Sequence, residues 1–140
     1  MIRQLKIGEL DSVMKIWLET NIKAHDFINK SYWQENYAAV KEILPNAEVF
    51  VYEENHIIRG FIGLMQNYIA GIFVDADNQS RGVGKALLDS VKENHSELSL
   101  QAYKKNVRAL KFYRREEFAV TKAQIDQHTG EEELVMKWTK

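Results

Sequence analysis

Two glycines separated by one residue, Gly82 and Gly84, follow an apolar run at 69–74 and open a segment with helical periodicity. The apolar residues of that segment recur every three or four positions and predict one buried stripe along a helix: Val83, Ala86, Leu87, Leu88 and Val91. Glycine leaves the main chain of a turn open to a ligand, and a helix start adds unpaired N–H groups and the positive end of its dipole. The order of strand, glycine turn and helix therefore predicts a main-chain anion site, and phosphate is the ligand that suits it best.

Two better-known phosphate motifs do not fit this turn. A P-loop needs glycine at position 79 and Ser or Thr at position 86, where the chain has Gln79 and Ala86. A dinucleotide fingerprint needs a third small residue at position 87, where Leu87 stands, and an acid at the end of the next strand, where 101–103 contains none. A turn that only joins a strand to a helix remains the alternative interpretation.

Length and charge limit the classes of protein that fit this chain. Its 140 residues, 45% hydrophobic and 28% charged, are typical of one globular domain, which we expect to span residues 1–140. The net charge is −1 and Lys and Arg are scattered, so we expect no basic face that binds nucleic acid. Anions the size of a mononucleotide are compatible with this charge.

Cysteine is absent from the chain, which excludes disulfides, thiolate metal ligands and a cysteine nucleophile and fits a reducing cytoplasm. The four histidines are far apart and show no ligand spacing, so we expect no metal. No stretch approaches the roughly 18 apolar residues of a membrane span. We therefore expect a soluble, cytoplasmic protein without a membrane partner.

Hydrophobic periodicity and turn residues predict four helices and seven strands. The strands are expected at 2–7, 47–53, 57–66, 68–74, 97–103, 119–126 and 132–138, and the helices at 10–18, 33–44, 83–91 and 107–116. The second and third strands are expected to pair as an antiparallel hairpin. Pro45 stops the second helix, Asn106 is a candidate N-cap of the fourth, and 21–32 is the least regular segment.

Two sequence motifs together resemble the GNAT superfamily of acyl-CoA-dependent N-acetyltransferases. Gln79, Gly82 and Gly84 match the three fixed positions of its R/Q-x-x-G-x-G/A signature. A second signature, N-x-x-A-x-x-F-Y followed by an aromatic residue, is matched by Asn106, Ala109, Phe112, Tyr113 and Phe118. The order of predicted elements agrees over the whole chain. The resemblance implies an α/β (α+β) fold, with a mixed, mostly antiparallel sheet of about seven strands flanked by four helices.

The segment between the first two helices is similar to a small bacterial single-domain subgroup of that superfamily. The similarity rests on Thr20 and Asn21, on the run Ala-His-Asp-Phe-Ile at 24–28, and on Tyr32 and Trp33. Some members of the subgroup modify protein lysines or amino-terminal amines. Because this region varies with the acceptor, it indicates relatives rather than a substrate.

The resemblance implies that acetyl-CoA is the donor and that its diphosphate lies on main-chain N–H groups of the glycine turn. Arg81 and Lys85 would add positive charge at the rim. Main-chain N–H groups near the end of the fourth strand would meet the thioester carbonyl as an oxyanion hole, worth roughly 2.7 to 4 kcal/mol in barrier. The implied donor-binding residues are Ile72, Phe73, Val74, Gln79, Ser80, Arg81, Gly82, Val83, Gly84, Lys85 and Asn106.

Tyr113 and His25 are the candidate catalytic residues. A phenol with a pKa of about 10 is protonated at neutral pH and can give its proton to the departing thiolate, so the family motif favours Tyr113 as general acid. Spacing alone favours a core tyrosine instead. His25 is the candidate base for the amine, with a helix-end histidine in a satisfied hydrogen bond as the alternative. Asp75 is a second candidate base, and Asn106 fits an N-cap, a contact to the pantetheine arm, or both.

Asp26, Phe27, Tyr32 and Trp33 are candidates for the wall of the acceptor pocket, although aromatic residues here also fit ordinary core packing. Two departures from the family pattern stand out. Many of its protein-lysine acetyltransferases carry a glutamate base in the fourth strand, which has no acid here, so a base must come from elsewhere or be water. Glu117 replaces a glycine, and a positive φ at that turn would strain it by about 1 kcal/mol.

The expected function is transfer of an acetyl group from acetyl-CoA to a primary amine, on a protein lysine or terminus or on a small molecule. Without a cysteine we expect direct attack by the amine in a ternary complex rather than an acyl-enzyme. The alternative is a non-catalytic acyl-CoA-binding regulator or interaction module. Monomer and homodimer both remain open, since the last strands have an exposed edge.

Overall fold

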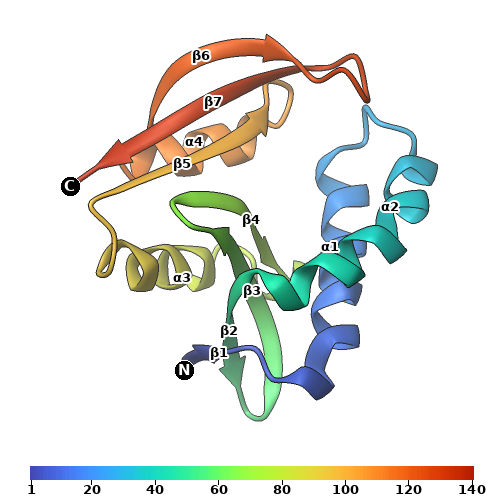
Figure 1. Ribbon diagram of the computed structural model, residues 1–140, viewed down its shortest axis with the longest axis vertical. Coiled ribbons are helices and arrows are strands. Elements are labelled where there is room, and N and C mark those ends of the chain that lie inside the picture. Colours follow the sequence, from blue (N-terminus) through green and yellow to red (C-terminus); the bar gives the residue numbers. More distant parts are fainter.

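The computed structural model describes all 140 residues and contains one seven-stranded sheet with helices on both faces (Figure 1). The strands are β1 (Ile2–Gln4), β2 (Glu48–Glu54), β3 (Ile57–Met65), β4 (Tyr68–Val74), β5 (Glu97–Tyr103), β6 (Ala119–Ile125) and β7 (Glu132–Thr139). The α-helices are α1 (Leu10–Ala24), α2 (Lys30–Ile43), α3 (Val83–Lys92) and α4 (Val107–Arg115). Short 3₁₀ turns lie at Ile7–Glu9, Leu44–Asn46 and Ala76–Asn78.

The sheet runs in the order β1-β2-β3-β4-β5-β7-β6, and every neighbouring pair is antiparallel except β4 and β5. These two strands pair only at Tyr68 with Ser99 and at Ile69 with Leu100. Figure 1 shows β1 to β4 as one group and β5 to β7 as another, diverging from this short contact. The edge of β4 beyond Ile69 is therefore left open. The expected fold, a mixed and mostly antiparallel sheet with four helices, is confirmed.

Two hydrophobic cores lie on opposite faces of the sheet. The larger packs α3 and α4 against β3, β4, β5 and β7, and the smaller packs α1 and α2 against β2 and β3. Neighbouring residues of β3 divide between them, Ile62 entering the larger core and Phe61 the smaller, as strand alternation requires. Leu87 and Leu88 of α3 are fully buried, which confirms the predicted stripe. This burial fixes the start of α3, and with it the glycine turn, at the end of β4.

The irregular segment between the first two helices is shorter than expected. α1 continues to Ala24, and its polar residues find partners inside the helix: Thr20 and Asn21 donate to carbonyls four residues earlier, at 2.6 and 2.9 Å. Asn29 caps α2 through its side-chain oxygen. Only 25–29 is left between the helices, so His25 lies at a helix end.

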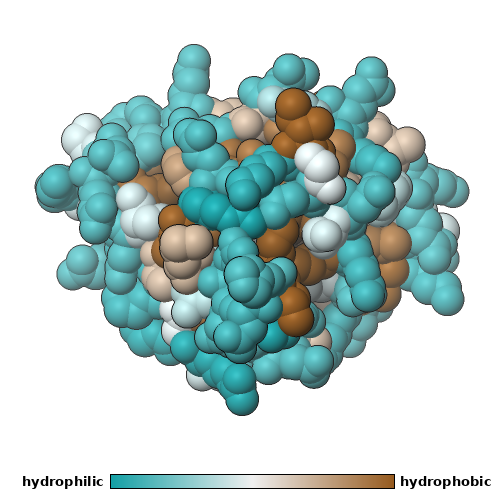
Figure 2. Space-filling model, turned by 90° about the horizontal axis from the view of Figure 1, so that it is seen from below, coloured by the Kyte–Doolittle hydropathy of each residue, from teal (hydrophilic) through white to brown (hydrophobic).

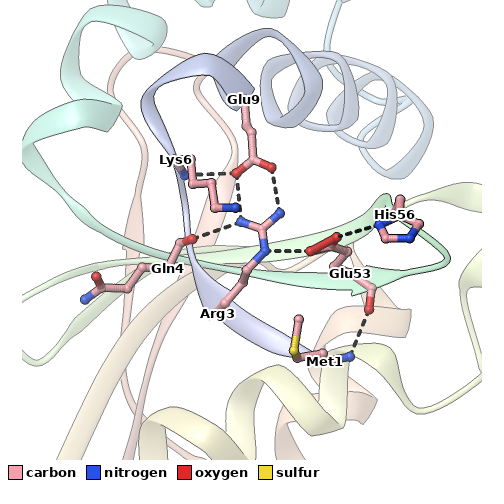
Figure 3. A network of polar contacts seen from close by, with 7 residues as sticks. All are labelled: Met1, Arg3, Gln4, Lys6, Glu9, Glu53 and His56. Atoms are coloured by element: carbon pink, nitrogen blue, oxygen red, sulfur yellow. Dashed lines mark hydrogen bonds and ion pairs between the residues drawn. The ribbon is translucent and has the colours of Figure 1, made fainter.

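β1 is also shorter than the strand expected at 2–7, ending after three residues. An ion cluster holds it in place (Figure 3). Arg3 donates to both carboxylate oxygens of Glu9, at 2.8 and 2.6 Å, and to Glu53 of β2 at 2.6 Å. The cluster links the 3₁₀ turn after β1 to the first two strands, whereas the sequence pattern predicts that the first strand continues to residue 7.

None of the helices combines the length and the apolar character that a membrane crossing requires. On the face drawn in Figure 2, apolar side chains show in separate spots between hydrophilic ones. The large apolar side chains that are exposed come from different elements, among them Ile7, Ile57 and Ile125.

Candidate active site

The glycine turn leaves seven consecutive main-chain N–H groups, from Gln79 to Lys85, without a well-aligned hydrogen bond to the protein. The next N–H, that of Ala86, donates to the carbonyl of Gly82 at 2.9 Å. Ser80 and Gly82 have positive φ angles of 64° and 84°, and the residue between them does not. Such alternation directs successive N–H groups to one side. Unpaired N–H groups and the positive end of the α3 dipole are the features that the predicted anion site requires.

The two glycines of the turn are there for different reasons. Gly82 has φ +84°, a conformation that costs a residue with a side chain roughly 1–2 kcal/mol. Gly84 has no such φ, and a Cβ there would meet Phe112 at 3.6 Å and Val74 at 3.7 Å, which are ordinary contacts. Neither backbone nor packing therefore requires a glycine at position 84. A small residue there keeps the N–H groups accessible, which fits a diphosphate lying along the main chain.

Arg108, which no sequence motif singled out, fastens the turn from α4. Its guanidinium donates to Oε1 of Gln79 at 2.7 Å and to the hydroxyl of Ser80 at 2.9 Å. Gln79 itself donates through Nε2 to the carbonyl of Val74 at 3.0 Å. One sequence signal could have indicated Arg108: it lies inside the second motif, two residues after Asn106. The fold places this first turn of α4 beside the glycine turn.

Lys85, which is expected to add positive charge at the rim of the turn, is paired with two carboxylates of the protein. Its ammonium is 3.1 Å from the carboxylate of Glu116 and 3.1 Å from that of Asp89, and these contacts raise the pKa of Lys85. Glu116 is buried, so Lys85 compensates a carboxylate inside the protein. Arg81 is exposed at the turn. Arg81 and Arg108 are therefore the cations best placed for a bound phosphate.

β4 presents main-chain groups to the gap between β4 and β5. The N–H of Asp75 bonds to a carbonyl of β3 at 2.8 Å. Alternation along this antiparallel pair then directs the N–H groups of Ile72 and Val74 away from β3, toward the open edge. The same alternation turns the N–H of Phe73 toward β3, and its ring stacks on Phe61 in the smaller core at 4.9 Å. Of the three residues expected there, two can donate to a thioester oxygen.

Tyr113 is buried in the larger core, 8% exposed, with Phe112 and Phe118 as ring neighbours. Burial, with a smaller contribution from Tyr68, raises the pKa of its hydroxyl above the ordinary value of 10.0, so the phenol is protonated at neutral pH. The hydroxyl of Tyr113 makes no hydrogen bond to the protein but is not fully enclosed. A Cβ built on Gly84 would contact the ring of Phe112, so the helix that carries Tyr113 adjoins the glycine turn.

His25 is enclosed by three aromatic rings. It stacks on Trp33 with centroids 5.2 Å apart, and meets Phe27 and Tyr103 edge to face at 5.7 and 5.1 Å. Its Nε2 lies 3.2 Å from the side-chain nitrogen of Asn106. Burial lowers the pKa of the imidazole to about 4. The structure thus brings together His25 and Asn106, which the sequence assigned to the acceptor side and the donor side.

The aromatic residues expected to line the acceptor pocket form one cluster. Tyr32 packs edge to face on Trp33, with centroids 5.0 Å apart, and Phe27 packs on Tyr103 at 5.7 Å. The hydroxyl of Tyr103, at the end of β5, donates to Asp126 beyond β6 at 2.6 Å. The segment between α1 and α2, the end of β5 and the β6–β7 loop therefore meet at this cluster, in the upper right of Figure 1.

A cavity of about 240 Å³ lies between α1 and the end of β4, next to the donor turn. Its lining consists of Ile16, Glu19, Thr20, Lys23, Asp75, Ala76 and Gln79. Asp75, the second candidate base, therefore faces a cavity that shares Gln79 with the turn. Glu19 adds a carboxylate that the sequence did not single out. Asp26, in contrast, is exposed and does not line this cavity.

Comparison with known proteins identifies the family of this chain. The family described as an acetyltransferase (GNAT) domain matches residues 19–140. Peptidyl-lysine N-acetyltransferase YiaC of Escherichia coli strain K12 is 33% identical over 140 residues, covering 99% of this chain and 96% of that protein. The solution structure of apo-form YjaB from Escherichia coli matches with a TM-score of 0.87 and 26% identity, covering 99% and 96% of the two chains.

A more distant neighbour shares the fold alone. The Salmonella typhimurium protein yncA, whose structure contains its cofactor acetyl-CoA, matches with a TM-score of 0.70 and 15% identity, covering 99% of this chain and 92% of that one. The family match includes both signature motifs, and these open α3 and α4 at the two helix starts described above. The chain belongs to the GNAT family of acetyltransferases.

Proposed function

We propose that this protein transfers the acetyl group of acetyl-CoA to the side-chain amine of a protein lysine. The observation that carries the proposal is the row of unpaired N–H groups from Gln79 to Lys85 at the start of α3, in the family's donor position. The acceptor class is supported by relatives similar over most of their length, since YiaC and YjaB are named peptidyl-lysine N-acetyltransferases.

The residues of the donor turn fit acetyl-CoA in shape and charge. The unpaired N–H groups donate to the diphosphate oxygens, Gly84 leaves the path of the diphosphate open, and Arg81 and Arg108 supply positive charge. When bound, the thioester supplies an activated acetyl group, whose carbonyl carbon bonds to the amine nitrogen while the carbon–sulfur bond breaks and sulfur leaves with the electron pair.

Two groups of the chain act on the charges that develop in this step. The N–H groups of Ile72 and Val74, at the open edge of β4, donate to the thioester oxygen, and one such donor is worth roughly 2.7 to 4 kcal/mol in barrier. The hydroxyl of Tyr113 gives its proton to the leaving sulfur, and the phenolate regains a proton, directly or through solvent, from the attacking nitrogen, which loses one as it becomes the amide. Burial holds Tyr113 protonated beforehand.

The acceptor amine must be neutral when it attacks, because an ordinary lysine with a pKa of about 10.4 is almost fully protonated at neutral pH. β4 carries no acid between Tyr68 and Val74. Asp75 at the end of β4 faces the cavity beside the turn, and we propose that the proton leaves to Asp75 or to water. The lone pair of His25 Nε2 already faces an amide, which argues against a base at that position.

Acetyl transfer is proposed to be direct, within a ternary complex. The chain has no cysteine that could carry an acyl group. Intact-mass measurement after incubation with acetyl-CoA alone should therefore show unmodified protein, and stoichiometric acetylation of one serine would contradict direct attack.

Thiol release from acetyl-CoA tests the function. The acceptors are a peptide with a blocked amino terminus and one lysine, the same peptide with acetyl-lysine, and a set of small amines. Release with the free lysine and none with its acetylated form is expected. Binding of CoA without release with any amine would instead support the non-catalytic module, and release with small amines alone would exclude protein lysine.

A further inference from the structure

The side chain of Asn106 has a fixed orientation in this structure. Its Oδ1 accepts the N–H of Ala109 at 3.2 Å and so caps α4. Turning the amide around would place its NH₂ group against that N–H and lose the cap, which is typically worth about 1 kcal/mol. The amide nitrogen is therefore the end that faces His25, 3.2 Å from Nε2.

This orientation determines the protonation state of His25. The nitrogen of an amide has only hydrogens to offer, so Nε2 must accept the hydrogen bond with its lone pair. The ring is then neutral, with its hydrogen on Nδ1. That nitrogen is enclosed without a well-aligned partner, and the side chains packed on the ring are Phe27, Trp33 and Tyr103, none of which is charged at neutral pH.

The contact joins segments that serve different substrates in the proposed reaction. His25 follows the last residue of α1 and begins the segment that borders the acceptor cluster. Asn106 opens α4, whose first turn also carries Arg108 against the donor turn and whose second half carries Tyr113. Beside this hydrogen bond, the acceptor segment contacts Tyr103 at the end of β5 through the rings of His25 and Phe27. Lys105 Nζ also lies 5.6 Å from the centre of the Phe27 ring.

We propose that His25 is a positioning residue, a neutral hydrogen-bond acceptor that holds Asn106 and thereby sets the acceptor segment in register with α4. It neither takes the proton of the amine nor touches the thioester. This inference rests on the proposed function for its catalytic consequence, whereas the hydrogen bond and the tautomer are properties of the protein alone.

Two substitutions separate positioning from base catalysis. His25→Gln places an amide oxygen within reach of the Asn106 nitrogen but does not titrate. His25→Phe keeps a ring to stack on Trp33 but accepts no hydrogen bond. We expect His25→Phe to lower kcat/KM for the lysine peptide about tenfold or more, with His25→Gln recovering most of the loss. Tyr37→Leu is the control, because it removes a ring contact with Trp17 elsewhere in the smaller core and no hydrogen bond.

The pH dependence of kcat/KM distinguishes a positioning residue from a base. If His25 were the base, His25→Gln would lose about 10²–10⁴-fold in rate and no longer show the acid limb of kcat/KM. Loss of that size in the Gln variant, or equal rates in wild type, His25→Gln and His25→Phe, would overturn the proposal.

Nitrogen-15 NMR of the free protein tests the tautomer without any substrate. We expect the His25 signals of a neutral ring with protonated Nδ1, unchanged between pH 5.5 and 8. Asn106→Asp keeps a capping oxygen but replaces the donor by an acceptor, and should move the proton to Nε2. A wild-type ring that carries its hydrogen on Nε2 or titrates near pH 6.5 would overturn the proposal. Absence of turnover in every sample would overturn the proposed function and leave this test standing.

Discussion

The guanidinium of Arg108 donates to the hydroxyl of Ser80 at 2.9 Å and so links the first turn of α4 to the donor turn. A bound diphosphate offers this cation a stronger, charged acceptor. We predict that Arg108→Ala weakens acetyl-CoA binding about tenfold, since a hydrogen bond to a charged group is worth roughly 1.5–3 kcal/mol. Calorimetry at low salt measures the change.

Lys111→Ala is the control for Arg108, because it removes the same charge from an exposed position on the same helix. Lys85→Ala should also leave donor affinity nearly unchanged but lower stability, because it removes the nearer ion-pair partner of the buried Glu116 and leaves only Arg115, at 3.9 Å. Equal affinities for Arg108→Ala and Lys111→Ala would remove Arg108 from the donor site.

Tyr113→Phe removes the proposed acid and keeps the ring in the larger core. We predict that kcat falls about 10²-fold or more while the affinity for CoA and the fold persist. Burial raises the pKa of Tyr113 above 10.0. The wild-type rate should therefore not fall through ionisation of this acid at any pH below 10.0. Steady-state kinetics up to pH 9.5 check both points. A Phe variant with wild-type kcat would show that sulfur takes its proton elsewhere.

The two glycines should respond differently to alanine. Gly82→Ala forces a side chain into a positive φ and should cost roughly 1–2 kcal/mol of stability together with donor affinity. Gly84→Ala meets only ordinary contacts and replaces a helical glycine, so its stability should stay level or rise by about 0.5–1 kcal/mol. Urea unfolding of both variants gives the comparison, and a Gly84→Ala variant less stable than Gly82→Ala would contradict it.

Glu117 occupies a position that favours glycine. Its φ is +74°, and the N–H of the next residue, Phe118, bonds to the carbonyl of Tyr113 at 2.9 Å as helix ends with a left-handed residue do. We predict that Glu117→Gly stabilises the protein by about 1 kcal/mol. Glu117→Ala removes the same charge but keeps a Cβ, so it should bring no such gain. Similar unfolding midpoints for the two variants would assign the effect to charge.

The ion cluster at β1 makes part of the stability depend on pH. Hydrogen bonds from Arg3 hold the pKa of Glu9 at about 2, below the ordinary 4.5. The folded state therefore binds the proton more weakly, so the stabilisation is present above pH 4.5 and is lost as the pH falls toward 2. Since both side chains are partly exposed, Glu9→Gln should cost only about 1 kcal/mol at pH 7.

Unfolding free energies of wild type and Glu9→Gln should accordingly converge as the pH falls from 5 to 2. Glu54→Gln, at an exposed end of β2, is the control and should show no such convergence. A difference between Glu9→Gln and wild type that stays constant over this range would contradict the role of the cluster.

The elements followed from the sequence wherever local patterns decide them. The buried stripe of α3, the Asn106 cap and the hairpin of β2 and β3 all rest on residues close in the chain. The pattern was wrong where side chains bond back to the main chain. Thr20 and Asn21 are typical loop residues, but their side chains bond within α1, which continues past them to Ala24.

The site could be predicted only as far as its motifs reach. The glycine turn and the second signature predict where the donor would bind, because their main-chain geometry depends on neighbouring residues. Lys85 pairs with Glu116, thirty-one positions away, and Arg108 reaches Ser80 from another helix. His25 meets Asn106 across eighty-one positions. Such contacts depend on tertiary packing, which no local pattern carries.

Backbone amide NMR during titration with acetyl-CoA examines the main-chain donor site itself. The largest shifts should fall on the N–H groups of residues 79–85, with Ile72 and Val74 next and the β1–β2 edge unaffected. Saturation with acetyl-CoA that leaves the amides of 79–85 unshifted would show that the donor binds elsewhere, and the proposed mechanism would fail with it.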